Sequence, residues 1–131
     1  VIERPMFMVV AIEQEYAGHA KQAGFAAANT PNGAYGGRYV VVVDDDVDVT
    51  NLQQVIWAMC TRCAAEDIDV IHGVYTSPLD PVIDDRERPT SSRAIIDATR
   101  PFDEEFPEAI HWNDEFREEV RDDFDLDELA L

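Results

Sequence analysis

Short runs of consecutive apolar residues alternate along this chain with stretches in which apolar residues recur every three or four positions. The apolar runs predict strands over residues 6–14, 39–43 and 68–74, and a shorter strand over residues 93–98. Because residues 39–43 are apolar at consecutive positions, we expect this central strand to be covered on both faces of the sheet.

Two stretches with helical features lie between these strands. The alanine-rich residues 17–29 favour a helix by propensity. A second helix is expected to follow a capping box formed by Thr50 and Gln53. Its apolar face is expected to contain Leu52, Val55, Ile56, Met59 and Cys63.

The remaining segments predict loops and a helical carboxyl end. Residues 30–37 are rich in turn-forming residues and predict a loop, and residues 76–92 contain three prolines and predict a longer one. Trp112, Phe116 and Val120 recur at a spacing of four, which predicts an amphipathic helix, and a weaker helix is expected after it.

Strands that alternate with helices indicate an α/β protein. We expect a layered domain with a small, mostly parallel or mixed sheet flanked by helices, plus a C-terminal helical extension. A chain of 131 residues has room for one core. We therefore divide it into an α/β domain over residues 1–110 and acidic C-terminal helices over residues 111–131, for which we expect a contact between subunits.

The formal charge of −18 argues against nucleic acid and anionic membranes as partners, since both require cationic surfaces. The chain has 28 Asp and Glu, and nine of its ten basic residues are Arg, so Lys is almost absent. This composition resembles the surface of a protein adapted to high salt, and the alternative is simply an acidic protein. No apolar run has the roughly 18 residues of a membrane span. The first four residues lack an initiator Met and the features of a signal peptide, so we expect a cytoplasmic protein whose chain begins within a longer one or after processing.

An acidic cluster, Asp44-Asp45-Asp46-Val47-Asp48, follows the central strand. Carboxylates at this edge of an α/β sheet could bind a metal ion, as they do in receiver domains of two-component signalling. A receiver also requires a downstream Lys and a strand-end Asp acceptor, but the only lysine, Lys21, lies upstream. The alternative is that these aspartates stabilise the start of the next helix.

No other local motif predicts catalysis. Cys60 and Cys63 lie near the end of their helix rather than at its start, where redox-active pairs lie, so we expect reduced core cysteines. His19, His72 and His111 are scattered, and no metal site is predicted.

Several segments, taken together, point to a family. They are Glu15-Tyr-Ala-Gly-His-Ala-Lys-Gln22, Tyr35-Gly-Gly-Arg-Tyr39 with the strand and aspartates after it as far as Leu52, Val55-Ile-Trp-Ala-Met-Cys-Thr-Arg62, Ser77-Pro-Leu-Asp-Pro81 and Ser92-Arg-Ala-Ile-Ile-Asp-Ala-Thr-Arg-Pro101. In this order they resemble segments of the C-terminal domain of the UbiD family of decarboxylases, over roughly residues 7–120. No single segment would be specific.

The resemblance implies a decarboxylase of aromatic or α,β-unsaturated acids that uses prenylated flavin mononucleotide with Mn or Mg. It also implies that the catalytic glutamates, the flavin and the metal lie mainly on a preceding domain, so this chain alone is not expected to be catalytic. The C-terminal domain would close one side of the substrate pocket and form a homo-oligomer.

The resemblance also implies roles for individual residues. Tyr35, Gly36, Ser77, Pro78 and Leu79 would face the substrate, with a core position as the alternative for Leu79. Lys21 and Arg38 could reach the flavin phosphate, although exposed surface charges are the alternative. Trp112, Phe116 and Val120 would contact another subunit or pack on this domain.

A second interpretation keeps the fold, as a stand-alone small subunit that assembles with a separate catalytic chain. The third interpretation is the receiver domain.

Overall fold

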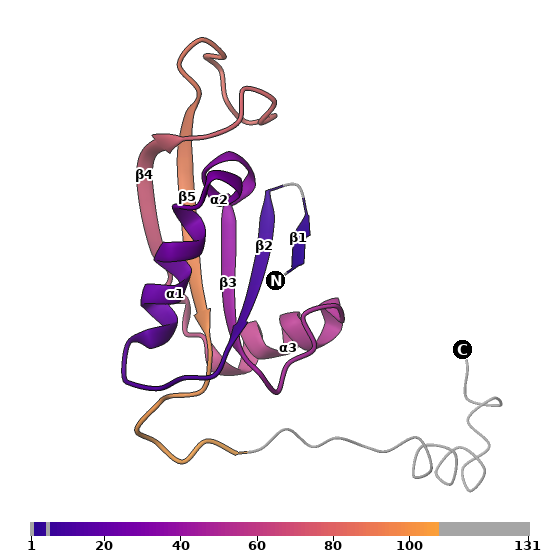
Figure 1. Cartoon of the computed structure of the whole chain (residues 1–131), viewed down its shortest axis with the longest axis vertical. Helices are drawn as coiled ribbons and strands as arrows, with labels where there is room; N and C mark the ends of the chain where they lie inside the picture. Colours follow the sequence, from indigo (N-terminus) through magenta and orange to yellow (C-terminus); the bar gives the residue numbers. More distant parts are fainter. Residues whose placement is uncertain (1, 5, 108–131) are drawn as a thin grey trace, which may run out of the picture.

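Five strands form one mixed sheet in the computed structural model, which describes residues 2–4 and 6–107 (Figure 1). The spatial order is β1-β2-β3-β5-β4, in which β2, β3 and β5 are parallel and each outer strand is antiparallel to its neighbour. The strands are β1 (Ile2–Arg4), β2 (Phe7–Ile12), β3 (Tyr39–Asp44), β4 (Asp69–Tyr75) and β5 (Thr90–Ala98).

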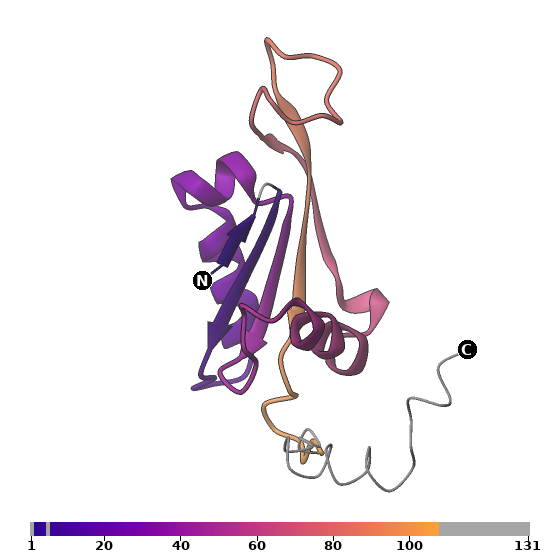
Figure 2. The ribbon, with the colours of Figure 1, turned by 90° about the vertical axis from the view of Figure 1, so that its right-hand side faces the viewer.

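Helices cover both faces of this sheet (Figure 2). On one face lie α1 (His19–Ala28) and the short α2 (Pro31–Gly36), and on the other lies α3 (Leu52–Arg62). A single 3-10 turn, Ala65–Asp67, leads from α3 into β4. The layered α/β fold and the mixed sheet predicted from the sequence are confirmed.

The core has two halves, separated by β3. Val41 and Val43 pack with Val9, Val55 and Ile96 beneath α3, whereas the alternate residues of β3 face α1. All four valines of β3, Val40–Val43, are fully buried. The prediction that residues 39–43 form a strand covered on both faces is therefore correct.

Two local predictions were wrong because capping chemistry had been misassigned. Residues 31–36 form a helix rather than a loop, since Pro31 occupies the first turn and the Thr30 hydroxyl accepts a hydrogen bond from the Gly33 amide at 3.0 Å. The cap of α3 is Asn51, not Thr50: its side-chain oxygen accepts from the amides of Gln53 and Gln54.

The buried face of α3 differs in part from the predicted one. Val55 and Ala58 are buried, but Leu52 and Ile56 point outward and are about half exposed. Cys60 is exposed, so it is not a core cysteine, whereas Cys63 is partly buried and burial raises its pKa. Both thiols are free.

The β4–β5 hairpin is longer than the sequence predicted. β5 begins at Thr90 rather than residue 93, and β4 follows it to Tyr75, so the two strands extend past the beginning of β3 (Figure 1). Polar residues at 90–92 concealed this extension, because they lie where the hairpin is exposed. The strand β1 was not predicted.

The predicted C-terminal helices, with Trp112, Phe116 and Val120, lie outside the described residues. No helix in the described part of the chain is long and apolar enough to cross a membrane.

Glycines set the close packing of α1 against its surroundings. A Cβ at Gly24 would meet the γ-methyl groups of the buried residues Ile95 and Val42, whereas a Cβ at Gly33 would overlap the backbone carbonyl of Ala27. That carbonyl belongs to α1 and cannot move without the helix. The position of α2 therefore depends on the absence of a side chain at Gly33.

We predict that Gly33→Ala destabilises the fold by about 1–3 kcal/mol, the usual cost of overpacking, because α2 must move away from α1. Gly24→Ala is the matched comparison: its methyl meets buried side chains and no backbone, so it should also destabilise the fold, but less than Gly33→Ala. Urea unfolding of both variants measures the difference. A loss at Gly33 no larger than that at Gly24 would contradict the fixed position of α2.

Candidate functional site

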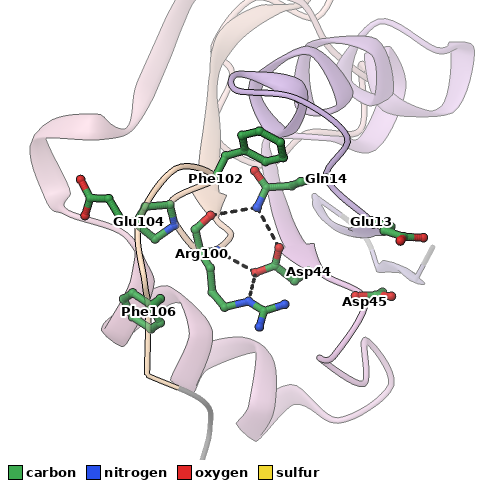
Figure 3. Close-up of a pocket in the computed structure, with 9 residues that line it drawn as sticks. Glu13, Gln14, Asp44, Asp45, Arg100, Phe102, Glu104 and Phe106 are labelled. Carbon is green, nitrogen blue, oxygen red and sulfur yellow. Dashed lines mark hydrogen bonds and ion pairs between the residues drawn. The ribbon is translucent and has the colours of Figure 1, made fainter.

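Polar residues gather at both ends of the sheet. One group lies at the carboxyl ends of the parallel strands, around Asp44 (Figure 3). The other lies at the opposite end, where α2 and the segment after β4 come together. The first group was the candidate metal or phosphate site, and the second contains the predicted substrate-facing residues.

Asp44, at the end of β3, is the centre of the first group and is 3% exposed. Its Oδ2 receives the Arg62 guanidinium at 3.0 Å and the Arg100 backbone amide at 2.7 Å, and the Arg100 side chain lies 3.4 Å away. Its Oδ1 accepts from the Gln14 side chain at 2.9 Å (Figure 3). Gln14 also donates to the Arg100 carbonyl, so Asp44 joins the segments after β2, β3 and β5.

Arg62, at the end of α3, neutralises two of the aspartates. Its two terminal nitrogens also lie 3.0 and 2.8 Å from the two carboxylate oxygens of Asp46, a bidentate pair that lowers the pKa of that carboxyl. The Arg62 side chain is fully buried, with its guanidinium 5.0 Å from the centre of the Trp57 ring. The Asp46 carboxylate in turn raises the pKa of Arg62.

The acidic cluster is therefore a structural network. The oxygens of Asp44 already accept from protein donors, and Asp48 accepts from the amide and hydroxyl of Thr50 in a local turn that lowers its pKa. An open, acidic cavity of about 400 Å³ lies beside Asp44. Among residues 2–4 and 6–107, no three His, Cys, Asp or Glu side chains are grouped to hold a metal ion.

The opposite end of the sheet brings Tyr35 close to the end of β4. The rings of Tyr35, on α2, and Tyr75 lie 6.1 Å apart between centroids and are about half exposed. Gly36, the last residue of α2, is partly buried. The structure thus places the first predicted substrate-facing segment next to the beginning of the second.

The second segment, residues 76–82, is held by a buried carboxylate that the sequence analysis did not single out. Asp80 is 0% exposed and pairs with Arg38, which directly precedes β3. The two oxygens of Asp80 also accept from the Val82 amide and the Thr76 hydroxyl, each at 3.0 Å. A charge buried this completely needs such partners, so Arg38 and Asp80 fix the segment to the sheet.

This anchoring gives the predicted pocket residues different environments. Leu79 is 78% exposed, so the alternative that it packs in the core is wrong. Ser77 is buried, and its hydroxyl accepts from the Leu79 amide at 3.1 Å. Pro78 lies between them and is partly buried. Tyr35 and Leu79 are thus the members of the predicted set that present large exposed side chains.

Lys21 and Arg38 are not brought together. Lys21 lies in the first turn of α1 and pairs with Asp69 at 3.1 Å, which raises its pKa. Arg38 lies at the opposite end of the parallel strands and pairs with Asp80. Each cation therefore already has a carboxylate partner.

The unpredicted features are the pairings of charged residues with distant partners, including that of Arg38, which had been assigned a different role. Arg62 and Arg100 meet Asp44, Arg38 meets Asp80, and Arg93 enters the fold from β5. A charged residue at the edge of an apolar run, such as Arg93, was the available signal. It could not identify the partner, because these contacts join residues 18 to 65 positions apart.

Comparison with known proteins gives a consistent result. The family model of the 3-octaprenyl-4-hydroxybenzoate carboxy-lyase C-terminal domain matches residues 3–98. A phenolic acid decarboxylase of Sedimentibacter hydroxybenzoicus is 37% identical over 95 residues, which are 72% of this chain and 19% of the relative. An anhydromevalonate phosphate decarboxylase of Archaeoglobus fulgidus is 39% identical over 98 residues, 74% of this chain and 21% of the relative.

A solved structure agrees with these relatives. The UbiD-class enzyme HmfF from Pelotomaculum thermopropionicum, in complex with FMN, superposes with a TM-score of 0.70 at 30% identity and covers 82% of this chain and 24% of that one. The chain thus spans about a fifth of the length of the curated relatives it matches. The matched family lends no support to the receiver-domain interpretation.

We predict that Arg62→Met destabilises the protein by about 3 kcal/mol at neutral pH, because the buried Asp44 carboxylate loses a partner. The matched control is Arg88→Met, at an exposed position whose side chain makes no hydrogen bond within the described residues. Denaturant unfolding monitored by circular dichroism gives both values. A loss no larger than that of the control would show that Gln14 and Arg100 suffice for Asp44.

The ion pair between Arg62 and Asp46 predicts that the stabilisation depends on pH. Arg62 lowers the pKa of Asp46 in the folded state, so its stabilisation is present above the unfolded pKa, ordinarily 3.8, and is lost as pH falls through the lowered folded value. The stability difference between wild type and Arg62→Met should therefore narrow in acid. A difference that does not change with pH would mean that Arg62 stabilises the fold by packing on Trp57.

Proposed function

The chain belongs to the UbiD family and contains its C-terminal domain, and on this premise we propose that it forms one side of the substrate pocket and a subunit contact in a decarboxylase. The substrate would be an aromatic or α,β-unsaturated carboxylic acid. Its relatives include decarboxylases named for a phenolic acid and for anhydromevalonate phosphate. The complete protein or complex that contains this chain would carry out the reaction.

The observation that supports this proposal most directly is the exposure of Leu79 on a segment that is otherwise firmly anchored. Asp80, the next residue, is fully buried, while Leu79 is 78% exposed. Exposed apolar side chains that gather into a patch on a fixed segment are suited to contact a ligand or another domain. Tyr35 and Tyr75 add exposed aromatic surface nearby.

The proposed role of these residues is to shape the pocket and exclude water. Leu79 and Tyr35 would contact the ring or the unsaturated chain of the substrate, and Gly36 would let the α2 backbone approach it. Ser77 is small and buried, so its contribution would be to hold the Leu79 amide and leave space beside it. Removing water from such a site strengthens the electrostatic interactions that act on the carboxylate.

The described residues do not fit the flavin or the metal. Lys21 and Arg38 are each paired with a carboxylate, and they come from opposite ends of the sheet. We therefore assign no phosphate contact to them and derive no step through the cofactor. Prenylated FMN and Mn or Mg would bind to segments that the longer relatives carry in addition, as a preceding domain or a large subunit.

The subunit contact is proposed to involve Trp112, Phe116 and Val120, together with the outer face of α3. Leu52, Ile56 and Trp57 on that face are 58%, 49% and 37% exposed. Residues 52–65 contain no Asp or Glu, in a chain with 28 of them. An acid-free, apolar helix face on so acidic a protein is well suited to contact a second copy, because it avoids repulsion between like charges.

We predict that Leu79→Ala lowers kcat/KM of the complete protein for its acid substrate by roughly tenfold or more, the range expected for lost hydrophobic contact in a pocket. Because Leu79 is exposed, the free energy of unfolding should change by less than about 0.5 kcal/mol. Val82→Ala is the matched control, at a position 61% exposed in the same segment. Equal kinetic effects of the two variants would contradict the proposed contact.

We predict that replacing both Trp112 and Phe116 by Ala lowers the oligomeric state, since burial of two aromatic side chains contributes several kcal/mol to an interface. Light scattering of the complete protein measures its mass, and Phe102→Ala, at a half-exposed position, serves as the control. An unchanged mass would place the two aromatic residues in internal packing.

A further inference from the structure

Arg93 carries a buried charge without an acidic partner among the described residues. It lies on β5, is 5% exposed, and forms no ion pair with a described carboxylate. Burial lowers its pKa, and its Nε has no hydrogen-bond partner in the described structure. A buried cation is costly, so the contacts that it makes instead of an ion pair need an explanation.

Those contacts are three backbone carbonyls from three different segments. One terminal nitrogen donates to the carbonyl of Ala28, at the end of α1. The other donates to Ala34 in α2 at 3.0 Å and to Tyr75 at the end of β4 at 3.2 Å. The carbonyl of Ala28 is at a helix carboxyl end, where the partial negative charge favours a cation.

The terminal nitrogen of Arg93 that donates to both Ala34 and Tyr75 joins the two segments that carry the exposed residues of the proposed pocket. Ala34 is covalently next to Tyr35, and Tyr75 directly precedes the segment 76–82 that presents Leu79. The Tyr35 and Tyr75 rings themselves lie 6.1 Å apart between centroids. A shift of either carbonyl would therefore move one of these side chains relative to the other.

We propose that Arg93 is a positioning residue that sets the separation of Tyr35 and Leu79, and thereby the selectivity of the pocket for substituents on its substrate. This inference rests on the proposed function. Arg93 contacts neither the substrate nor the cofactor in this account. It acts through the two backbone segments that it holds.

The geometry also explains why the residue is an arginine. A guanidinium presents donors on two terminal nitrogens in a rigid fork, so it can reach carbonyls on separate segments at once. A lysine has one nitrogen on a flexible stem. Arg38 differs from Arg93, because it binds the Asp80 side chain and therefore holds only one of the two segments, residues 76–82.

Hydrogen exchange tests the coupling without any assay of activity. In Arg93→Met, the amides of Ala34 in α2 and Gly37 directly after it, and those of Asp80 and Val82, should all exchange roughly tenfold faster or more, because hydrogen bonds from a charged donor are lost. In Arg38→Met, only the amides of residues 76–82 should do so. Arg88→Met controls for loss of a surface charge.

Two exchange results would overturn the inference. One is an Arg93→Met pattern identical to that of Arg38→Met, and the other is unchanged exchange in both segments of a folded variant. If Arg93→Met does not fold, Arg93→Lys replaces it. This variant keeps the charge but not the fork, and should show the same joint loss of protection to a smaller extent.

Kinetics of the complete protein test the effect on selectivity. Arg93→Lys should change the ratio of kcat/KM between an unsubstituted and a ring-substituted aromatic acid, as Leu79→Ala should. A merely structural role would scale both rates equally through the amount of folded enzyme. An unchanged ratio would overturn the inference if Leu79→Ala alters it. If Leu79→Ala also leaves it unchanged, the proposed pocket contact fails, and exchange alone decides whether Arg93 couples the segments.

Discussion

The four fully buried valines of β3 impose the constraint on which the rest of the structure depends. They occupy the middle of both core layers, so the chain can become polar only where this strand begins and ends. At its beginning Arg38 pairs with Asp80, and at its end Asp44 pairs with Arg62 and Arg100. Removing one partner of a buried ion pair is strongly destabilising, because it leaves the other charge unpaired. Each pair therefore ties a distant loop to an end of β3.

The described arginines act chiefly as connectors in this protein. Arg62 and Arg100 hold α3 and the segment after β5 to Asp44. Arg93 holds α2 and the end of β4, and Arg38 holds the segment after β4. In a chain with a net charge of −18, cations are scarce, and these four lie at the places where separate segments meet. Their use as internal joints leaves an acidic outer surface interrupted by the apolar face of α3.

Hydrophobic periodicity predicted the layers and most strands, because the pattern of apolar residues within a short segment shows whether one or both faces of a strand or helix are buried. It could not show which apolar residues of α3 face outward, since Leu52 and Ile56 satisfy the helical spacing as well as Val55 does. The short α2 was missed because Thr30 and Pro31 favour a turn and a helix start equally well. The motifs singled out Tyr35 and Leu79 as candidate pocket residues, which stays a prediction, but the pairing of Asp80 with Arg38 depends on three-dimensional proximity alone.

The extension of the β4–β5 hairpin beyond β3 has an evolutionary consequence. The parts of β4 and β5 that extend beyond β3 form a two-stranded arm, and the segment that carries Leu79 follows β4 there. This arm lies outside the part of the sheet that both helix layers cover (Figure 1). Beyond Asp80 the connection to Thr90 is exposed for most of its length. Substitutions and insertions there can therefore accumulate without passing through the core. A single scaffold could thus diverge toward acids of different shape by changing its arm, while the buried strand and its end pairs remain as they are.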